Sequence, residues 1–151
     1  RPGDYPGQRF NVEYVGARSR RITGDPLVEY LREWGFWGGD RDILRLRPVF
    51  RISDKITFRP GYDLNDIRID PHRVIIHVLN SRLDYTFTNR LLTSFIVQHN
   101  SLDRVTGFNI RLNYIYRGSD NFFIIYNRLN DRLTSFEHEG LILKFTRSFD
   151  F

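Results

Sequence analysis

Apolar and polar residues alternate along a series of similar segments that begins near residue 42. In the first segment, ILRLRPVFRI, Leu44, Leu46 and Phe50 share one parity, while Arg45 and Arg47 share the other. The same alternation recurs in KITFRPGYDLN, LNSRLDYTF, FNIRLNYIY and LILKFTRSFDF, and less cleanly in LLTSFIVQH and NFFIIYN. Successive side chains of a β-strand point to opposite faces, so each segment predicts a strand with one apolar and one polar face. We therefore expect an all-β chain.

The connections between these segments alternate between short and long. SD, TN and RGSD are tight turns, whereas DIRIDPH, NSLDRVTG and RLNDRLTSFEHEG are longer links. Positions on either side of the tight turns differ by an even number, which keeps one face continuous around each hairpin: Ile52/Ile56, Phe87/Leu91 and Tyr116/Phe122. Strands of about nine to eleven residues suit a tilted strand that crosses a bilayer. The order predicts an antiparallel up-and-down transmembrane β-barrel.

The first forty residues are less regular. RFNVEYVGA reads as a strand, and PLVEYLREWGFWGG reads as either a strand or a short helix. We expect residues 1–40 to hold an N-terminal strand or two and a loop, and residues 41–151 to hold the barrel strands. The total is eight or nine strands, and even counts are favoured in bacterial single-chain barrels. About eight strands is therefore expected, with a larger barrel as the alternative.

The net charge of +5 comes almost wholly from arginine, because lysine occurs only at Lys55 and Lys144. Arginine without lysine favours fixed, hydrogen-bonded ion pairs and not the electrostatic patch of a nucleic-acid-binding protein. No segment has the roughly 20 apolar residues of a membrane helix. The N-terminal RPGDYPGQRF lacks a signal-peptide pattern, so we expect that a signal was removed or that the chain is a piece of a longer one.

The polar parity carries many charged residues on neighbouring strands. In a membrane barrel this parity faces the lumen. The expected lumen-facing residues, which would form a pore lining or a polar network, are Arg45, Arg47, Arg51, Arg59, Asp63, Arg82, Asp84, Arg111 and Lys144. Uncompensated buried charge is costly. Glu13, Glu29 and Glu33 are candidate partners, and otherwise the lumen is wet or belongs to a wider barrel.

Aromatic residues gather near the two ends of the apolar parity, as expected for residues at the membrane–water interfaces. Tyr85, Phe87, Tyr114 and Tyr116 lie near the short turns. Tyr62, Tyr126, Trp34 and Trp37 lie near the long links.

Four stretches resemble the C-terminal barrel segment of a large, mostly uncharacterised bacterial outer-membrane family. They are WGFWGGDRDILRLRPVFRIS, NSRLDYTFTNRL, VQHNSLDRVTGFNIRLNYIYRGSDNFFIIYN and the closing LKFTRSFDF, within residues 30–151. In that family a sugar-binding-like β-sandwich module commonly precedes the barrel. Phe145, Phe149 and Phe151 resemble the signal read by the barrel-assembly machinery, although Arg147 departs from it. The resemblance implies a Gram-negative outer membrane, with lipids, lipopolysaccharide, the assembly machinery and further strands or subunits as partners.

Little in the sequence indicates catalysis or cofactor binding. His72, His77, His99 and His138 form no pair at metal-binding spacing. Gly38 and Gly39 suit a tight turn and not a phosphate site. We predict no catalytic residue, no metal, no cofactor and no nucleic-acid partner, and a role as channel, anchor or scaffold.

Two alternatives stay open. A soluble basic β-barrel that binds a ligand would bury Phe58, Leu83, Leu112 and Phe145 in a dry interior. An outer-membrane hydrolase would bring Asp63 together with His77 or His99 at the rim of the barrel.

Overall fold

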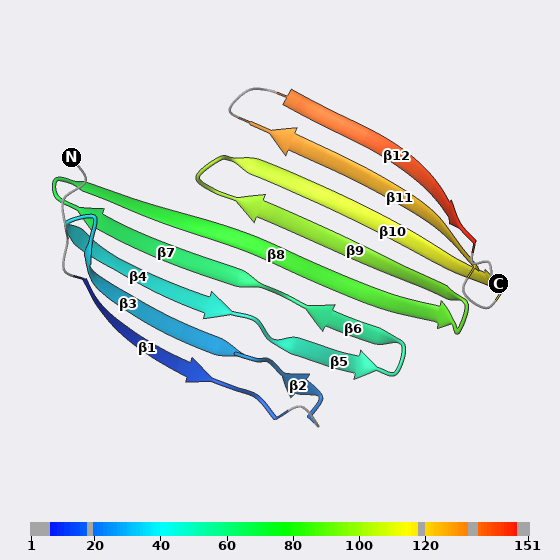
Figure 1. The fold of residues 1–151 in the computed structure, drawn as a ribbon, viewed down its shortest axis with the longest axis horizontal. Helices are drawn as coiled ribbons and strands as arrows, with labels where there is room; N and C mark the ends of the chain where they lie inside the picture. The colour runs from blue at the N-terminus through cyan, green and yellow to red at the C-terminus, as the bar shows by residue number, and fades with distance from the viewer. Residues whose placement is uncertain (1–6, 18–19, 118–119, 133–135, 148–151) are drawn as a thin grey trace.

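The computed structural model describes residues 7–17, 20–117, 120–132 and 136–147, and they form one antiparallel sheet of 12 strands (Figure 1). The strands are β1 (Gln8–Tyr14), β2 (Ile22–Thr23), β3 (Val28–Phe36), β4 (Gly39–Leu46), β5 (Val49–Ser53), β6 (Ile56–Arg59), β7 (Tyr62–Ile69), β8 (His72–Thr88), β9 (Leu91–Asn100), β10 (Val105–Arg117), β11 (Asp120–Asp131) and β12 (Phe136–Thr146). The all-β, antiparallel prediction is confirmed.

The sheet follows chain order, β1-β3-β4-β7-β8-β9-β10-β11-β12, which is nine strands. The short strands β2, β5 and β6 lie beyond the ends of β3, β4 and β7 in Figure 1. The long strand β8 pairs with β7 along residues 72–79 and with β6 along residues 82–85.

Two segments predicted as single strands are each divided in two. ILRLRPVFRI is interrupted at Pro48, and KITFRPGYDLN is interrupted at Pro60 and Gly61. Proline has no backbone N–H to donate to a neighbouring strand, which explains both interruptions. Adding Cβ to Gly61 would place it 2.6 Å from the carbonyl oxygen of Asn80, so β8 approaches this break closely.

The long links were predicted too long. β7 runs to Ile69 and β8 starts at His72, so most of DIRIDPH is strand and only Asp70 and Pro71 form the turn. In the same way β11 reaches Asp131 and β12 starts at Phe136. The prediction was wrong because charged residues were read as loop, whereas here they pair across strands. With 17 residues, β8 also exceeds the predicted strand length.

The predicted short hairpins are confirmed, and each contains an irregularity in register. The shifts fall between Arg51 and Ser53, between Thr86 and Thr88, and between Ile115 and Arg117. A bulge adds one residue to one strand. That extra residue keeps Leu91 and Phe122 on the same face as Tyr114, as the even spacing predicted.

The N-terminal region is entirely strand where it is regular. β1 pairs with β3, so RFNVEYVGA and PLVEYLREWGFWGG both contribute strands, and the helix alternative for the second is wrong. The tight turn at Gly38 is confirmed, since Trp37 and Gly38 have φ angles of 50° and 81° at the end of the β3–β4 hairpin.

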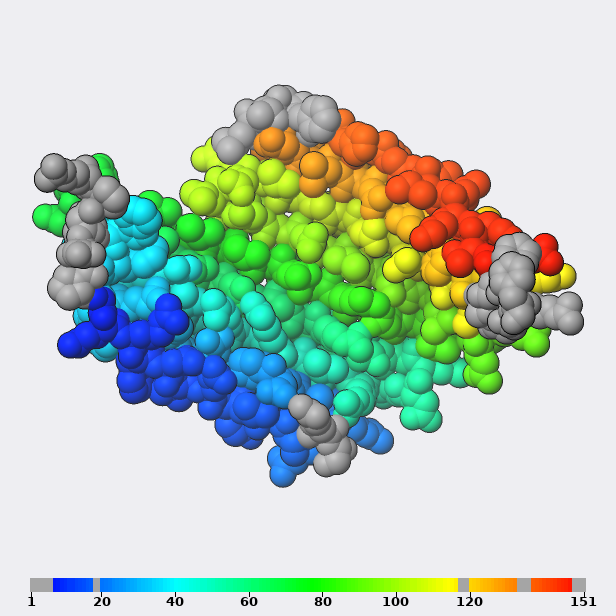
Figure 2. Space-filling model, viewed as in Figure 1, coloured from blue at the N-terminus to red at the C-terminus, as the bar shows by residue number. Residues whose placement is uncertain are grey.

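The sheet is not closed. β1 and β12 form its two edges, and their atoms lie at opposite margins of Figure 2. An open sheet does not test whether a barrel forms, so closure stays a prediction. Among the described residues no helix is long and apolar enough to span a membrane.

Register assigns each side chain to one of two faces. The apolar face contains a row that runs across seven strands: Phe50, Phe58, Leu83, Phe95, Ile110, Tyr126 and Leu141. The polar face lies opposite. Among the described hydrophobic residues only Leu31 and Ile43 are buried, and both lie on the polar face. No described segment therefore covers the apolar face, and Phe95, Ile110 and Leu141 are exposed.

Candidate functional site: the polar face

The nine residues predicted to line a lumen lie on the polar face. Arg45 is opposite Asp63, Arg59 is opposite Arg82, and Asp84, Ser94 and Arg111 follow one another across β8, β9 and β10. Arg51 is opposite Thr57 and Lys144 is opposite Phe123, which places both charged residues on this face. Arg47 lies beside them and contacts Asp63.

Ion pairs cross β1, β3 and β4 on the polar face. The Arg45 Nη1 donates to Glu29 Oε2 at 2.8 Å, and Glu29 is buried. Glu33 pairs with Arg9 and lies 3.7 Å from the Arg41 Nη1. The suggestion that Glu29 and Glu33 supply partners for the arginines is confirmed. These carboxylates neutralise guanidinium groups around Leu31 and Ile43, which allows the charges to lie next to buried apolar residues.

Two aspartates organise the arginines in the middle of the sheet. Asp63 Oδ2 lies 3.1 Å from the Arg47 Nη2. Asp84 pairs with both Arg59 and Arg82, the latter through Nε at 2.7 Å, and it accepts a 2.6 Å hydrogen bond from the Ser94 hydroxyl. One carboxylate therefore orients two guanidinium groups.

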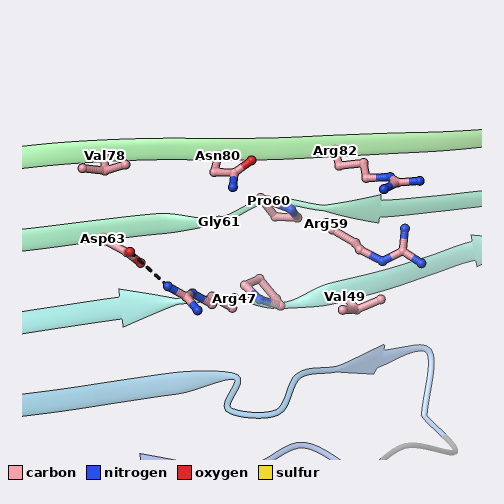
Figure 3. Close-up of a pocket in the computed structure, with 10 residues that line it drawn as sticks. Arg47, Val49, Arg59, Pro60, Gly61, Asp63, Val78, Asn80 and Arg82 are labelled. Carbon is pink, nitrogen blue, oxygen red and sulfur yellow. Dashed lines mark hydrogen bonds and ion pairs between the residues drawn. The ribbon is translucent and has the colours of Figure 1, made fainter. Parts of the chain in front are cut away.

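A hollow of about 420 Å³ lies where the strands are interrupted (Figure 3). Its lining includes Arg47, Arg59, Arg82 and Asn80, whose side chains lie on one side of the ribbons in Figure 3, together with Pro48 and Pro60. Because Gly61 has no side chain, the β7 backbone can approach β8 at this point, and the Asn80 N–H donates to the Gly61 carbonyl oxygen at 2.8 Å.

A second hollow of about 420 Å³ adjoins the first, and Arg82 lines both. Asp84, Ser94, Arg111 and Phe123 also line it. The Arg111 guanidinium carbon lies 4.8 Å from the centre of the Phe123 ring, which is a cation–π contact.

The polar face of β9 to β12 carries amides and apolar groups where the N-terminal strands carry ion pairs. Asn109 donates a side-chain hydrogen bond to Asn127. The half-buried side chains of Ile96 and Ile125 lie on the same face. Ile142 of β12 is half exposed there.

A charged cluster that the sequence analysis missed lies on the apolar-face side, where β3, β4, β7 and β8 extend past the apolar rows. It consists of Arg32, Asp40, Asp42, Asp66, Arg68 and Arg73. Arg73 donates two hydrogen bonds to Asp66, at 2.9 and 2.8 Å, and Arg68 pairs with it as well. These two arginines, Arg73 foremost, hold the pKa of Asp66 well below its usual range. The signal was the alternation of charges in DIRIDPHR, which was read as a loop.

The aromatic candidates on the strands lie on the apolar face, and Trp37 lies in the β3–β4 turn. Tyr85 and Phe87 meet edge to face with ring centres 4.4 Å apart, near the β8–β9 turn. Exposed Tyr114 and Tyr116 end β10 near its short turn. Near the other end, the Tyr62 hydroxyl lies 2.7 Å from His77 Nδ1 and the Tyr126 hydroxyl donates to Glu139 at 2.9 Å. Among the assembly-signal residues, Phe145 is exposed on β12, and Phe149 and Phe151 lie outside the described residues.

The contact that would indicate a rim hydrolase is absent from the described residues. Asp63 is on the polar face, opposite Val78, whereas His77 is on the apolar face, opposite Leu64. His99 Nδ1 lies 2.8 Å from the Thr106 hydroxyl, also on the apolar face. In the part of the chain that the structure describes, no three His, Asp or Glu side chains could hold a metal ion.

No family model, curated protein or solved structure matches this chain.

Proposed function

We propose that this chain forms the wall, or part of the wall, of a β-barrel in the outer membrane of a Gram-negative bacterium. The apolar face would contact lipid and the polar face would line the lumen. The observation that carries the proposal is that exposed and half-buried apolar side chains form a continuous row across one face, while charged side chains pair with one another on the other face. A soluble protein rarely exposes so continuous an apolar surface.

The edge of the apolar area supports this orientation, because it runs obliquely across the strands. The change from apolar to charged falls at the same register on β3, β4 and β7, where it lies between Leu64 and Asp66 on β7. On β11 and β12 it falls at another shared register, between Tyr126 and Arg128 on β11. Followed through the register to β8, these two positions differ by about six residues, and β3 and β12 are about seven inter-strand spacings apart. With about 3.3 Å per residue and 4.8 Å per strand, the mean slope is about 30°. Strands of membrane barrels tilt by a similar angle, about 35–45°.

The soluble binding module is less well supported. It would bury Phe58, Leu83, Leu112 and Phe145 in a dry interior and turn the polar face outward. The polar face, however, holds Leu31 and Ile43, the buried hydrophobic residues of the described chain, packed among paired charges. Closing the barrel requires β1 and β12 to meet each other or to pair with further strands, whether from the same protein or from a partner, since open edges in lipid leave backbone groups unpaired.

The test is to measure which face contacts lipid. The chain has no cysteine, so single substitutions Ile110→Cys and Asn109→Cys can carry one environment-sensitive fluorophore on neighbouring residues of opposite faces. In vesicles with brominated acyl chains, we expect strong quenching at position 110 and weak quenching at position 109. Equal quenching, or recovery of the protein as a soluble monomer without detergent, would reject the barrel.

A further inference from the structure

We infer that the lumen of the proposed barrel selects small anions that carry a carboxylate or phosphate group, through an arginine belt formed by Arg47, Arg59, Arg82 and Arg111. The inference rests on the proposed function and adds a substrate class to it.

The belt lies at the middle height of the apolar face. Arg59 and Arg82 are direct neighbours in sequence of Phe58 and Leu83, which belong to the row of apolar residues that crosses seven strands. On β6 and β7 the apolar residues extend from Ile56 at one end to Leu64 at the other, and Arg59 lies between them. A solute that crosses the membrane through this lumen would therefore meet these guanidinium groups midway, where the surrounding lipid keeps the effective dielectric constant low.

The charge of the belt is not balanced. Four guanidinium groups line the two adjoining hollows, and the carboxylates among the lining residues are Asp63 and Asp84. Asp84 serves both Arg59 and Arg82. In the described segments no carboxylate lies within salt-bridge distance of Arg111, which instead lies over the Phe123 ring. The belt therefore carries an excess of positive charge that an anion would neutralise.

The arginine side chains are also more exposed to the solvent than the aspartates that pair with them. The side chains of Arg47, Arg59 and Arg82 are 56%, 45% and 49% exposed, whereas those of Asp63 and Asp84 are each 25% exposed. The aspartates therefore lie nearer the backbone of the sheet and orient the arginines. The guanidinium groups present N–H donors to the open hollow. A guanidinium group binds carboxylate and phosphate oxygens with paired hydrogen bonds.

The interruptions of the sheet provide room for such an anion. Pro48, Pro60 and Gly61 line the first hollow, beside Arg47, Arg59 and Arg82 (Figure 3). Asn80 adds a neutral amide to this lining, and Ser94 adds a hydroxyl to the second hollow. These groups can hydrogen-bond an anion without adding negative charge.

The experiment is to reconstitute the full-length protein in planar bilayers and measure the reversal potential in a KCl gradient. We expect a reversal potential that lies between zero and the equilibrium potential of chloride. We also expect added inorganic phosphate or acetate to block the chloride current. The double substitution R59Q/R82Q should move the reversal potential towards the equilibrium potential of potassium and weaken the block by phosphate or acetate. R59K/R82K, which keeps the charge, should retain chloride selectivity with weaker block, because lysine lacks the paired donors.

The control is Arg128→Gln, which removes one positive charge from the other face, as Arg111→Gln does from the belt, and should leave the reversal potential unchanged. Should R59Q/R82Q fail to fold, as judged by heat-modifiable migration on a gel, Arg111→Gln replaces it, because this side chain is not part of the Asp84 network. Inserted protein that does not conduct, that prefers potassium, or whose selectivity survives these substitutions would overturn the inference and leave the barrel standing. Failure to insert into lipid would instead reject the proposed function.

Discussion

The two halves of the polar face are held together in different ways. In the N-terminal half, from β1 to β7, buried Leu31 and Ile43 lie among ion pairs that include the buried Glu29. In the C-terminal half, from β9 to β12, amides such as Asn109 and Asn127 lie among isoleucines, and Ile142 is half exposed. The long strand β8 joins the halves, and the arginine belt lies on both sides of it.

This difference shows that the polar face is more tightly packed with side chains in its N-terminal half. Charges are tolerated next to apolar groups in the N-terminal half because each buried carboxylate has a cation beside it. In the described part of the C-terminal half no carboxylate is buried, so in a barrel this half would face water or further strands. Substitutions should therefore cost more stability in the N-terminal half, which four matched pairs can test.

The largest difference is expected for isoleucine truncation. Ile43→Ala should lower the free energy of unfolding by about 2–4 kcal/mol, because Ile43 is 3% exposed and its removal leaves a cavity. Ile142→Ala, at a 50% exposed position of the same face, should change it by less than about 0.5 kcal/mol. Urea titration of the folded protein in detergent micelles measures both. Equal losses would show that the two halves are equally packed.

Removing a buried charge should have the next largest effect. Glu29→Gln replaces the carboxylate 2.8 Å from the Arg45 guanidinium with a neutral amide and leaves that charge uncompensated, and we expect a loss of about 1–3 kcal/mol. Glu139→Gln on β12 alters an exposed residue that accepts one hydrogen bond from Tyr126, and should cost less than about 0.5 kcal/mol. The same titration applies, and a neutral Glu29→Gln would contradict the view that ion pairs stabilise the N-terminal half.

Substitution of two glycines tests how closely neighbouring strand backbones approach each other. Gly61→Ala would place Cβ 2.6 Å from the Asn80 carbonyl oxygen, so the strands must separate, and we expect a loss of about 1–2 kcal/mol. Gly107→Ala on β10 would meet only the Leu129 Cδ1 at 3.6 Å, an ordinary contact, and should be nearly neutral. Thermal midpoints on heat-modifiability gels compare the two. Matching midpoints would show that β6 to β8 can move apart freely.

The smallest effect concerns pH and the charged cluster beyond the apolar rows. Arg73 and Arg68 lower the pKa of Asp66 below its ordinary value of 3.8, so the stabilisation is fully present above that pH and is lost as the pH falls through the folded-state pKa. Asp66→Asn should therefore cost about 1 kcal/mol at pH 7, and the difference from the native protein should shrink as the pH is lowered below 3.8.

The matched control is Glu137→Gln, which removes an exposed carboxylate 3.6 Å from Arg128 in the C-terminal half. Unfolding midpoints at pH 7 and at pH 3 suffice for both variants. A cost for Asp66→Asn that does not change with pH would mean that packing, and not charge, explains its role.

The alternation of side chains was enough to predict most of the strands, the two faces and which charged residues share the polar face, because period-two patterning is a local property of the chain. It could not predict where strands end when charged residues pair across them, as Asp66 and Arg73 do. It also treated Pro48 and Pro60 as ordinary strand positions, and so missed the hollow beside them. Sharing of Asp84 by Arg59 and Arg82 depends on register between β6 and β8, which residue spacing within one strand does not reveal.

The length of β8 has a consequence for what the cell surface would present. Seventeen residues span about 56 Å, and at a lean of about 45° they rise by about 40 Å, against an apolar band of about 25 Å. In a barrel wall, the turn formed by Asp70 and Pro71 would then extend beyond the bilayer, to the height of the lipopolysaccharide sugars. The β3–β4 turn at Trp37 and Gly38 ends at the same register. An antibody, a phage or a neighbouring polysaccharide would therefore meet these two adjacent tips together.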